Sequence, residues 1–232
     1  MSARVRAVVF DLDGTLLDTA PDIAAATNRM LDELGLERRD SGEIARYIGK
    51  GIPRLVHRAL TGESAGEAEA QLFERARSIF ERCYGEESGR LTRPFPGVEE
   101  GLASLRALGL ALGCVTNKAE RFTLDLLERS RLAGYLECVV SGDSLPRRKP
   151  DPLPLLHACE RLRATPAQTL VIGDSANDVQ AARAAGCPVW CVPYGYNEGL
   201  PAATLDCDRM VADLREAAAI LTSARTWPAA AR

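Results

Sequence analysis

The sequence predicts an α/β fold, in which a doubly wound parallel sheet of the Rossmann-like kind carries a small inserted helical cap domain. Two features predict this architecture. Short apolar runs that end at polar residues or glycine alternate with longer segments whose apolar residues recur every three or four positions, which is typical of a parallel sheet with helices on both faces. The alternation is interrupted once, after the first apolar run, by a long stretch that has helical patterns and no strand run.

The expected elements follow the chain in order. Each strand is a short apolar run, and each helix shows the three- and four-residue spacing of an amphipathic helix. The strands are expected over residues 5–10, 110–115, 138–141, 169–172, 189–192 and 210–211. The helices between these strands are expected over residues 97–108, 119–132, 153–162 and 176–185.

The interrupted stretch defines the domain organisation. Residues 18–91 are expected to form the helical cap, and residues 1–17 and 92–221 the α/β core. The Pro-Phe-Pro-Gly segment at 94–97 marks the return to the core, because each proline biases the residue before it toward extended backbone. Residues 222–232 lack periodicity, so they are expected to form a flexible tail.

Composition excludes some classes of partner. The chain has 29 Lys and Arg against 32 Asp and Glu, a net charge of −3, so no basic excess indicates binding to nucleic acid or to an anionic membrane. The N-terminal apolar run is too short to span a bilayer and is not a signal peptide, and the seven cysteines are an odd set that falls largely in apolar runs. We therefore expect a cytoplasmic protein with reduced cysteines.

The first strand ends in an acidic segment, Asp-Leu-Asp-Gly-Thr, at residues 11–15. A calcium loop can begin in a similar way, but Gly14 stands at the fourth position of the segment instead of the sixth, and the twelfth position is Asp22 instead of Glu. In a doubly wound sheet the carboxyl ends of the strands meet at one crevice. Asp11 and Asp13 are therefore expected to face the polar residues that end the other strands.

A second pair of acids ends the fourth strand. Asp174 directly follows this strand, and Asp178 lies in the first turn of the next helix. Asp178 alone could be a favourable charge at a helix start. Together with Asp11, however, Asp174 supplies the hard oxygen ligands that Mg²⁺ prefers in proteins.

Two further segments have the chemistry to bind a phosphate. Thr116 and Asn117 end the second strand and open a helix, where hydroxyl, amide and backbone N–H groups can hold phosphate oxygens. Lys149 stands in a loop stiffened by two prolines and could direct a fixed positive charge into the crevice. A phosphoryl group in transfer, whose charge is spread over three oxygens, requires such a cation.

These four segments resemble, in order along the chain, the four signature motifs of the haloacid dehalogenase superfamily. The resemblance implies that Asp11 attacks the phosphorus of a phosphate monoester and forms an aspartyl-phosphate, and that Asp13 serves as general acid and base. Thr116 would contact the transferring group, and Lys149 would offset its charge. The implied Mg²⁺ ligands are Asp11, Asp13, Asp174 and Asp178.

The helical insertion resembles the cap of the superfamily branch that includes bacterial phosphoglycolate phosphatases. This resemblance implies a Mg²⁺-dependent phosphoric monoester hydrolase acting on a small phosphorylated metabolite, 2-phosphoglycolate being the expected substrate. Gly49, Lys50 and Arg54 form a cationic turn that could bind the substrate's carboxylate. Two alternatives stay open. The enzyme could hydrolyse another small phosphate, such as a sugar phosphate or pyrophosphate, or it could be a sugar phosphomutase. A monomer or a homodimer is expected.

Overall fold

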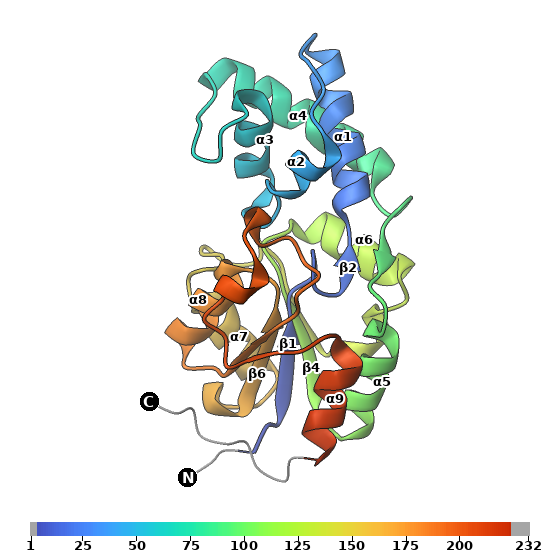
Figure 1. The fold of residues 1–232 in the computed structure, drawn as a ribbon, viewed down its shortest axis with the longest axis vertical. Helices are drawn as coiled ribbons and strands as arrows, with labels where there is room; N and C mark the ends of the chain where they lie inside the picture. The colour runs from blue at the N-terminus through green and yellow to red at the C-terminus, as the bar shows by residue number, and fades with distance from the viewer. Residues whose placement is uncertain (1–3, 224–232) are drawn as a thin grey trace.

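The computed structural model describes residues 4–223. Its main sheet has six parallel strands in the order β5-β4-β1-β6-β7-β8, and the connections between them carry helices (Figure 1). This confirms the predicted doubly wound α/β fold. The strands are β1 (Ala7–Phe10), β4 (Ala111–Val115), β5 (Cys138–Val140), β6 (Thr169–Gly173), β7 (Val189–Cys191) and β8 (Arg209–Met210).

Helices cover both faces of the sheet (Figure 1). Successive residues of a strand point to opposite faces, and in β1 the side chains of Val8 and Phe10 join one hydrophobic cluster while those of Ala7 and Val9 join another. The first cluster includes side chains of α5 (Val98–Ala107), α6 (Glu120–Arg129) and α9 (Leu214–Ser223). The second includes side chains of α7 (Leu153–Arg161) and α8 (Ala176–Ala185).

Residues 20–87 form a separate helical layer at the top of Figure 1, where four helices pack around a hydrophobic cluster of their own. Phe122 of α6 joins this cluster from below. The four helices are α1 (Ala20–Glu33), α2 (Ser41–Ala45), α3 (Gly51–Thr61) and α4 (Ala70–Glu87). Short 3-10 turns lie at Ala133–Tyr135, Pro166–Gln168, Asn197–Gly199 and Ala202–Thr204.

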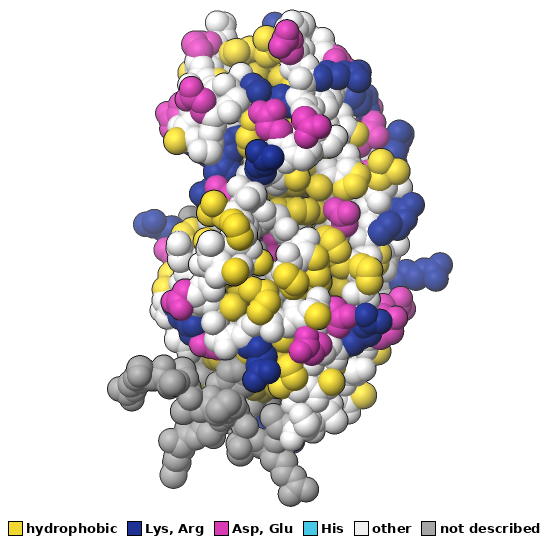
Figure 2. Space-filling model, viewed as in Figure 1, with side chains coloured by type: hydrophobic (Ala, Val, Ile, Leu, Met, Phe, Trp, Pro, Cys, Tyr) yellow, Lys and Arg dark blue, Asp and Glu magenta, His cyan; other side chains and the backbone are white. Residues whose placement is uncertain are grey.

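The described part of the chain ends within the predicted tail. Helix α9 includes residues 222 and 223, the first two of the tail, and the other tail residues lie outside the described part of the chain. Within residues 4–223, no helix is long and apolar enough to cross a membrane. On the face drawn in Figure 2, acidic and basic side chains are interspersed, so this face shows no extended basic patch of the kind that binds nucleic acid.

The chain passes between the α/β core and the helical layer twice, and hydrogen bonds join the two connecting segments. The two-residue strands β2 (Leu17–Asp18) and β3 (Arg93–Pro94) pair antiparallel. Just above them, the buried carboxylate of Asp22 accepts hydrogen bonds from the backbone N–H groups of Gly89, Leu91 and Thr92, at 2.8 to 3.0 Å, and from the Thr92 hydroxyl at 2.6 Å. One side chain on the outgoing segment therefore organises the returning segment.

Replacing this carboxylate is expected to destabilise the protein. Asp22→Ala would leave three N–H donors and one hydroxyl without an acceptor, and the two donors of Thr92 are buried, so the expected cost is about 3 kcal/mol of unfolding free energy. The matched control is Asp32→Ala on the same helix, because Asp32 forms an exposed ion pair with Arg38 and its loss should change stability by less than about 1 kcal/mol. Denaturant unfolding measures both, and equal effects of the two substitutions would contradict the role of Asp22.

Candidate active site

The predicted site residues come together at the carboxyl ends of adjacent strands. Asp11, Thr116 and Asp174 directly follow β1, β4 and β6, which are neighbours in the sheet. Lys149 reaches the same place from the loop between β5 and α7. This is the position at which ligands bind in open α/β sheets.

Three buried carboxylates form the centre of the site. One oxygen each of Asp11, Asp174 and Asp178 can be chosen so that all three lie within 4.8 Å of one another. Carboxylate oxygens are hard ligands that suit a divalent cation such as Mg²⁺ or Ca²⁺. The donor set therefore fits a divalent metal. Among residues 4–223, these three aspartates are the group of acidic, histidine or cysteine side chains that lie close enough together to bind one metal ion.

Lys149 is the cation of this centre. Its ammonium nitrogen lies 2.8 Å from Asp11 Oδ1 and 2.7 Å from Asp178 Oδ1, and it donates a hydrogen bond to the Val115 carbonyl at 2.6 Å. Burial alone would lower the pKa of Lys149, but the charges of Asp11 and Asp178 outweigh burial and raise it above its ordinary value. The lysine is therefore protonated at neutral pH.

The carboxylates carry more negative charge than Lys149 neutralises. Three acids and one ammonium would leave two negative charges if all were ionised. Burial raises the pKa of Asp11 to about 7, and burial together with the charges of Asp178 and Asp11 raises the pKa of Asp174 to about 8. A divalent cation would supply the two missing positive charges, which agrees with the fit of the donor set.

Hydrogen bonds fix the orientation of the two acids that follow β6. Asp174 Oδ1 accepts from the Thr15 hydroxyl at 2.7 Å, and its Oδ2 accepts from the Tyr196 N–H at 2.8 Å. Asp178 Oδ2 accepts from the Ser175 hydroxyl at 2.7 Å and from the Ser175 N–H at 3.0 Å. Both acids are thus held by partners outside the acidic centre.

A glycine makes room for Asp174. Gly14 has φ of +93°, a left-handed conformation that favours glycine. A Cβ atom at this position would lie 2.5 Å from Asp174 Oδ2. Gly14 of the predicted acidic segment therefore allows both the sharp turn of the backbone and the close approach of Asp174.

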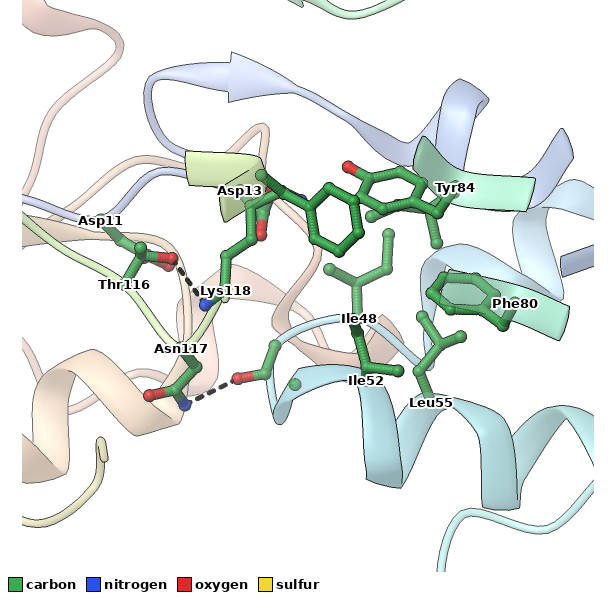
Figure 3. Close-up of a pocket in the computed structure, with 14 residues that line it drawn as sticks. Asp11, Asp13, Ile48, Ile52, Leu55, Phe80, Tyr84, Thr116, Asn117 and Lys118 are labelled. Atoms are coloured by element: carbon green, nitrogen blue, oxygen red, sulfur yellow. Dashed lines mark hydrogen bonds and ion pairs between the residues drawn. The ribbon is translucent and has the colours of Figure 1, made fainter. Parts of the chain in front are cut away.

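The structure places Asp13 outside the three-carboxylate group. Asp13 Oδ1 accepts a hydrogen bond from the Thr19 hydroxyl at 2.7 Å. It accepts a second from the Lys118 ammonium at 2.9 Å (Figure 3). The sequence predicts Asp13 both as a metal ligand and as an acid and base. Its side chain lies with Lys118 at the cavity described next, and it is not among the oxygens that group together.

A cavity lies between this centre and the helical layer (Figure 3). Its floor is polar and comes from the segments that follow β1 and β4. Its walls and roof are largely apolar and come from α1, the turn before α3, α3, α4 and Phe122 of α6. The lining residues are Asp11, Asp13, Ile23, Ile48, Gly49, Gly51, Ile52, Leu55, Phe80, Tyr84, Thr116, Asn117, Lys118 and Phe122.

The sequence predicts Thr116 and Asn117 as phosphate-binding residues, and both line the cavity. Thr116 is buried, and its hydroxyl accepts a hydrogen bond from the Lys118 N–H at 3.2 Å. The Asn117 amide donates to the carbonyl oxygens of Gly49 and Lys149, both at 2.9 Å. Asn117 therefore joins the phosphate-binding side of the site to the turn of the helical layer.

Of the three predicted substrate-binding residues in that turn, the structure brings one to the cavity. Gly49 lines it. Lys50 instead forms an ion pair with Glu198 at 2.6 Å, and Arg54 donates to the carbonyl oxygens of Ser64 and Gly66. Neither cation lines the cavity, because each is held by a partner outside it.

Lys118 is a site residue to which the sequence assigns no role. It lines the cavity and is buried, and it directly follows Thr116 and Asn117 in the chain. That adjacency is the signal that could identify it. Its partner Asp13 lies 105 positions away, so the pairing is visible only in the fold.

Comparison with known proteins agrees with this geometry. Residues 8–192 match the sequence model of the haloacid dehalogenase-like hydrolase family. The chain belongs to this family, and it is a hydrolase. The predicted membership of this family is therefore confirmed.

Individual relatives cover almost the whole chain. The protein is 54% identical to the phosphoglycolate phosphatase of Thiobacillus denitrificans, over 95% of this chain and 97% of the relative, and 56% identical to that of Nitrosospira multiformis, over 94% and 96%. Among solved structures, a predicted phosphoglycolate phosphatase from Haemophilus somnus superimposes with a TM-score of 0.87 at 32% identity, over 93% of this chain and 97% of that one.

Proposed function

We propose that the protein is a Mg²⁺-dependent phosphatase that hydrolyses 2-phosphoglycolate to glycolate and phosphate. The observation that carries the proposal is the buried group of Asp11, Asp174 and Lys149 beneath the cavity. The names of the near full-length relatives support the substrate. Mg²⁺ is favoured over softer metals because every candidate ligand in the group is a carboxylate.

The proposed reaction has two steps. A carboxylate oxygen of Asp11 attacks phosphorus, the bond between phosphorus and the ester oxygen breaks, and Asp13 donates a proton to the departing oxygen of glycolate. Water then attacks the aspartyl-phosphate and gives its proton to Asp13, which releases phosphate and regenerates the Asp11 carboxylate. A covalent intermediate divides one difficult displacement into two easier ones.

The other residues hold the transferring group in place. In the proposed site, Thr116 and the backbone N–H groups that follow β4 donate hydrogen bonds to phosphoryl oxygens, and Lys149 offsets the negative charge that accumulates beside Asp11. Mg²⁺ held by Asp11, Asp174 and Asp178 would neutralise the remaining charge and orient the phosphoryl group.

The size of the cavity favours a small substrate. Its interior measures about 40 Å³, whereas a single water needs roughly 10–15 Å³ on this measure. A cavity of this size favours a small phosphate ester over a bulky one. We propose that residues 18–91 act as the cap that encloses it, with residues 1–17 and 92–221 as the catalytic core. A cytoplasmic location and a monomeric or homodimeric state stay predictions from the sequence.

The test is phosphate release from a panel of small esters, namely 2-phosphoglycolate, sugar phosphates, pyrophosphate and an aryl phosphate, with Mg²⁺ present or chelated. We expect 2-phosphoglycolate to lead in kcat/KM by at least about tenfold, and chelation to lower its rate by about 100-fold or more. If another ester leads, the substrate assignment is wrong while the reaction type stands. Conversion of a sugar 1-phosphate to its 6-phosphate would instead indicate a mutase.

A further inference from the structure

The cations of the helical layer do not face the cavity. Glu198, in the loop after β7, binds Lys50 at 2.6 Å and Arg58 at 2.6 Å, and Arg54 is held by backbone carbonyls. Among residues 4–223, the cation that lines the cavity is Lys118, at the start of α6. A second negative group on a substrate in this cavity would therefore meet Lys118.

Lys118 has capacity for a further partner. Its side chain is 5% exposed, and the hydrogen bond described for its ammonium is the one to Asp13 Oδ1 at 2.9 Å. An ammonium has three N–H donors. The nitrogen also lies 4.8 Å from the ring centroid of Tyr84, close enough for a cation–π contact, so the side chain is held at the junction of the core and α4.

Tyr84 contributes an unsatisfied hydroxyl at the same place. The residue is 2% exposed and lines the cavity, and its hydroxyl lies near Lys118 and Ser88 without a hydrogen bond of normal geometry to any of residues 4–223. A buried hydroxyl without a well-formed hydrogen bond is unfavourable. Figure 3 shows the Tyr84 hydroxyl turned toward the side of the cavity where Asp13 and Lys118 lie. An acceptor placed in the cavity beside Lys118 would satisfy it.

We propose that Lys118 and Tyr84 form a subsite for the carboxylate of the substrate and determine the preference for 2-phosphoglycolate over neutral esters. The inference rests on the proposed function. In 2-phosphoglycolate a single methylene separates the ester oxygen from the carboxylate carbon. Lys118 lies 2.9 Å from Asp13. When the ester oxygen of the substrate faces Asp13, the substrate's carboxylate therefore lies close to Lys118.

The subsite makes a prediction that differs from a purely structural role for Lys118. Loss of the Asp13 contact alone would lower kcat for every ester equally. Loss of a carboxylate subsite raises KM for the acid and leaves KM for a neutral analogue unchanged. Hydrogen bonds to charged groups contribute about 1.5–3 kcal/mol, which corresponds to about 10-fold to 150-fold in relative kcat/KM.

The experiment compares the full-length enzyme, with Mg²⁺, on 2-phosphoglycolate and on its neutral amide, glycolamide phosphate. The measured quantity is the ratio of kcat/KM for the acid to that for the amide. Tyr84→Phe is expected to lower this ratio by about 10-fold and Lys118→Gln by about 100-fold, with the change in KM for the acid. Lys118→Arg, which keeps the charge, should retain most of the ratio.

Matched controls are available on the same elements. Tyr47→Phe removes the hydroxyl of another buried tyrosine of the helical layer, which bonds to Glu43 outside the cavity. Arg121→Gln removes an exposed cation of α6 that pairs with Glu81. Both should leave the acid-to-amide ratio within about twofold of wild type. Thermal melting of each variant identifies any that fails to fold, in which case Tyr84→Phe decides the question.

The outcomes separate the two proposals. If the wild-type enzyme does not favour the acid over the amide, the proposed substrate is wrong and the subsite falls with it. If the wild type favours the acid but Tyr84→Phe and Lys118→Gln keep the ratio, the subsite alone is wrong. If the ratio instead falls in Lys50→Ala, the carboxylate is bound by the turn of the helical layer, and the assignment to Lys118 and Tyr84 is overturned.

Discussion

Asp11→Asn is expected to lower kcat by about 10⁴- to 10⁶-fold, as does removal of other catalytic nucleophiles, while the protein keeps its fold. An amide of the same shape cannot attack phosphorus. It also removes a charge whose burial is unfavourable, since burial raises the pKa of Asp11 to about 7. The variant should therefore melt at or above the wild-type temperature when metal is chelated.

Phosphate release and thermal melting measure this prediction. The control is Asp125→Asn, which removes an exposed acid of α6 that pairs with Arg129 and should leave turnover unchanged. Turnover by the Asp11→Asn enzyme within tenfold of wild type would show that another group attacks phosphorus.

Lys149→Met is expected to have the largest effect on stability. Removing the ammonium leaves Asp11 and Asp178 without the cation that lies 2.8 and 2.7 Å away, and breaking a buried ion pair from one side costs about 3–5 kcal/mol. The loss should be greatest when metal is chelated. Added Mg²⁺ should raise the melting temperature of the variant more than that of the wild type, because it then supplies all of the positive charge.

The same variant should also lose activity. Without Lys149 the charge of the phosphoryl group is offset less fully, and kcat is expected to fall by about 10²- to 10³-fold. Arg147→Met, two residues away in the same loop but exposed, controls for a change in the loop itself. If melting of Lys149→Met with chelator matches that of the control, Lys149 does not neutralise the acidic centre.

Much of the site could be predicted from the sequence because its residues stand at strand ends. Asp11, Thr116 and Asp174 each directly follow an apolar run, and parallel strands bring such positions to one edge of the sheet. The fold follows from the same runs, with boundaries that differ by a few residues, such as Ala7–Phe10 for the strand expected over residues 5–10.

The rest depends on which charged side chains meet in three dimensions. Lys50 looks available in the sequence, but Glu198, 148 positions later, binds it in the fold. Asp13 and Asp11 stand two positions apart, and yet their carboxylates have different partners, Lys118 for the first and Lys149 for the second. The strands β2 and β3 have two residues each, too few for an alternating pattern to be recognised.

The pairing of β2 with β3 and the bonds of Asp22 to the returning segment have a mechanical consequence. Two unpaired connecting segments would allow the helical layer to rotate relative to the α/β core. Because β2 and β3 are paired, the two crossings form one two-stranded connection, which bends more easily than its strands slide past each other. The joined crossings therefore restrict how the helical layer can turn relative to the acidic centre below it.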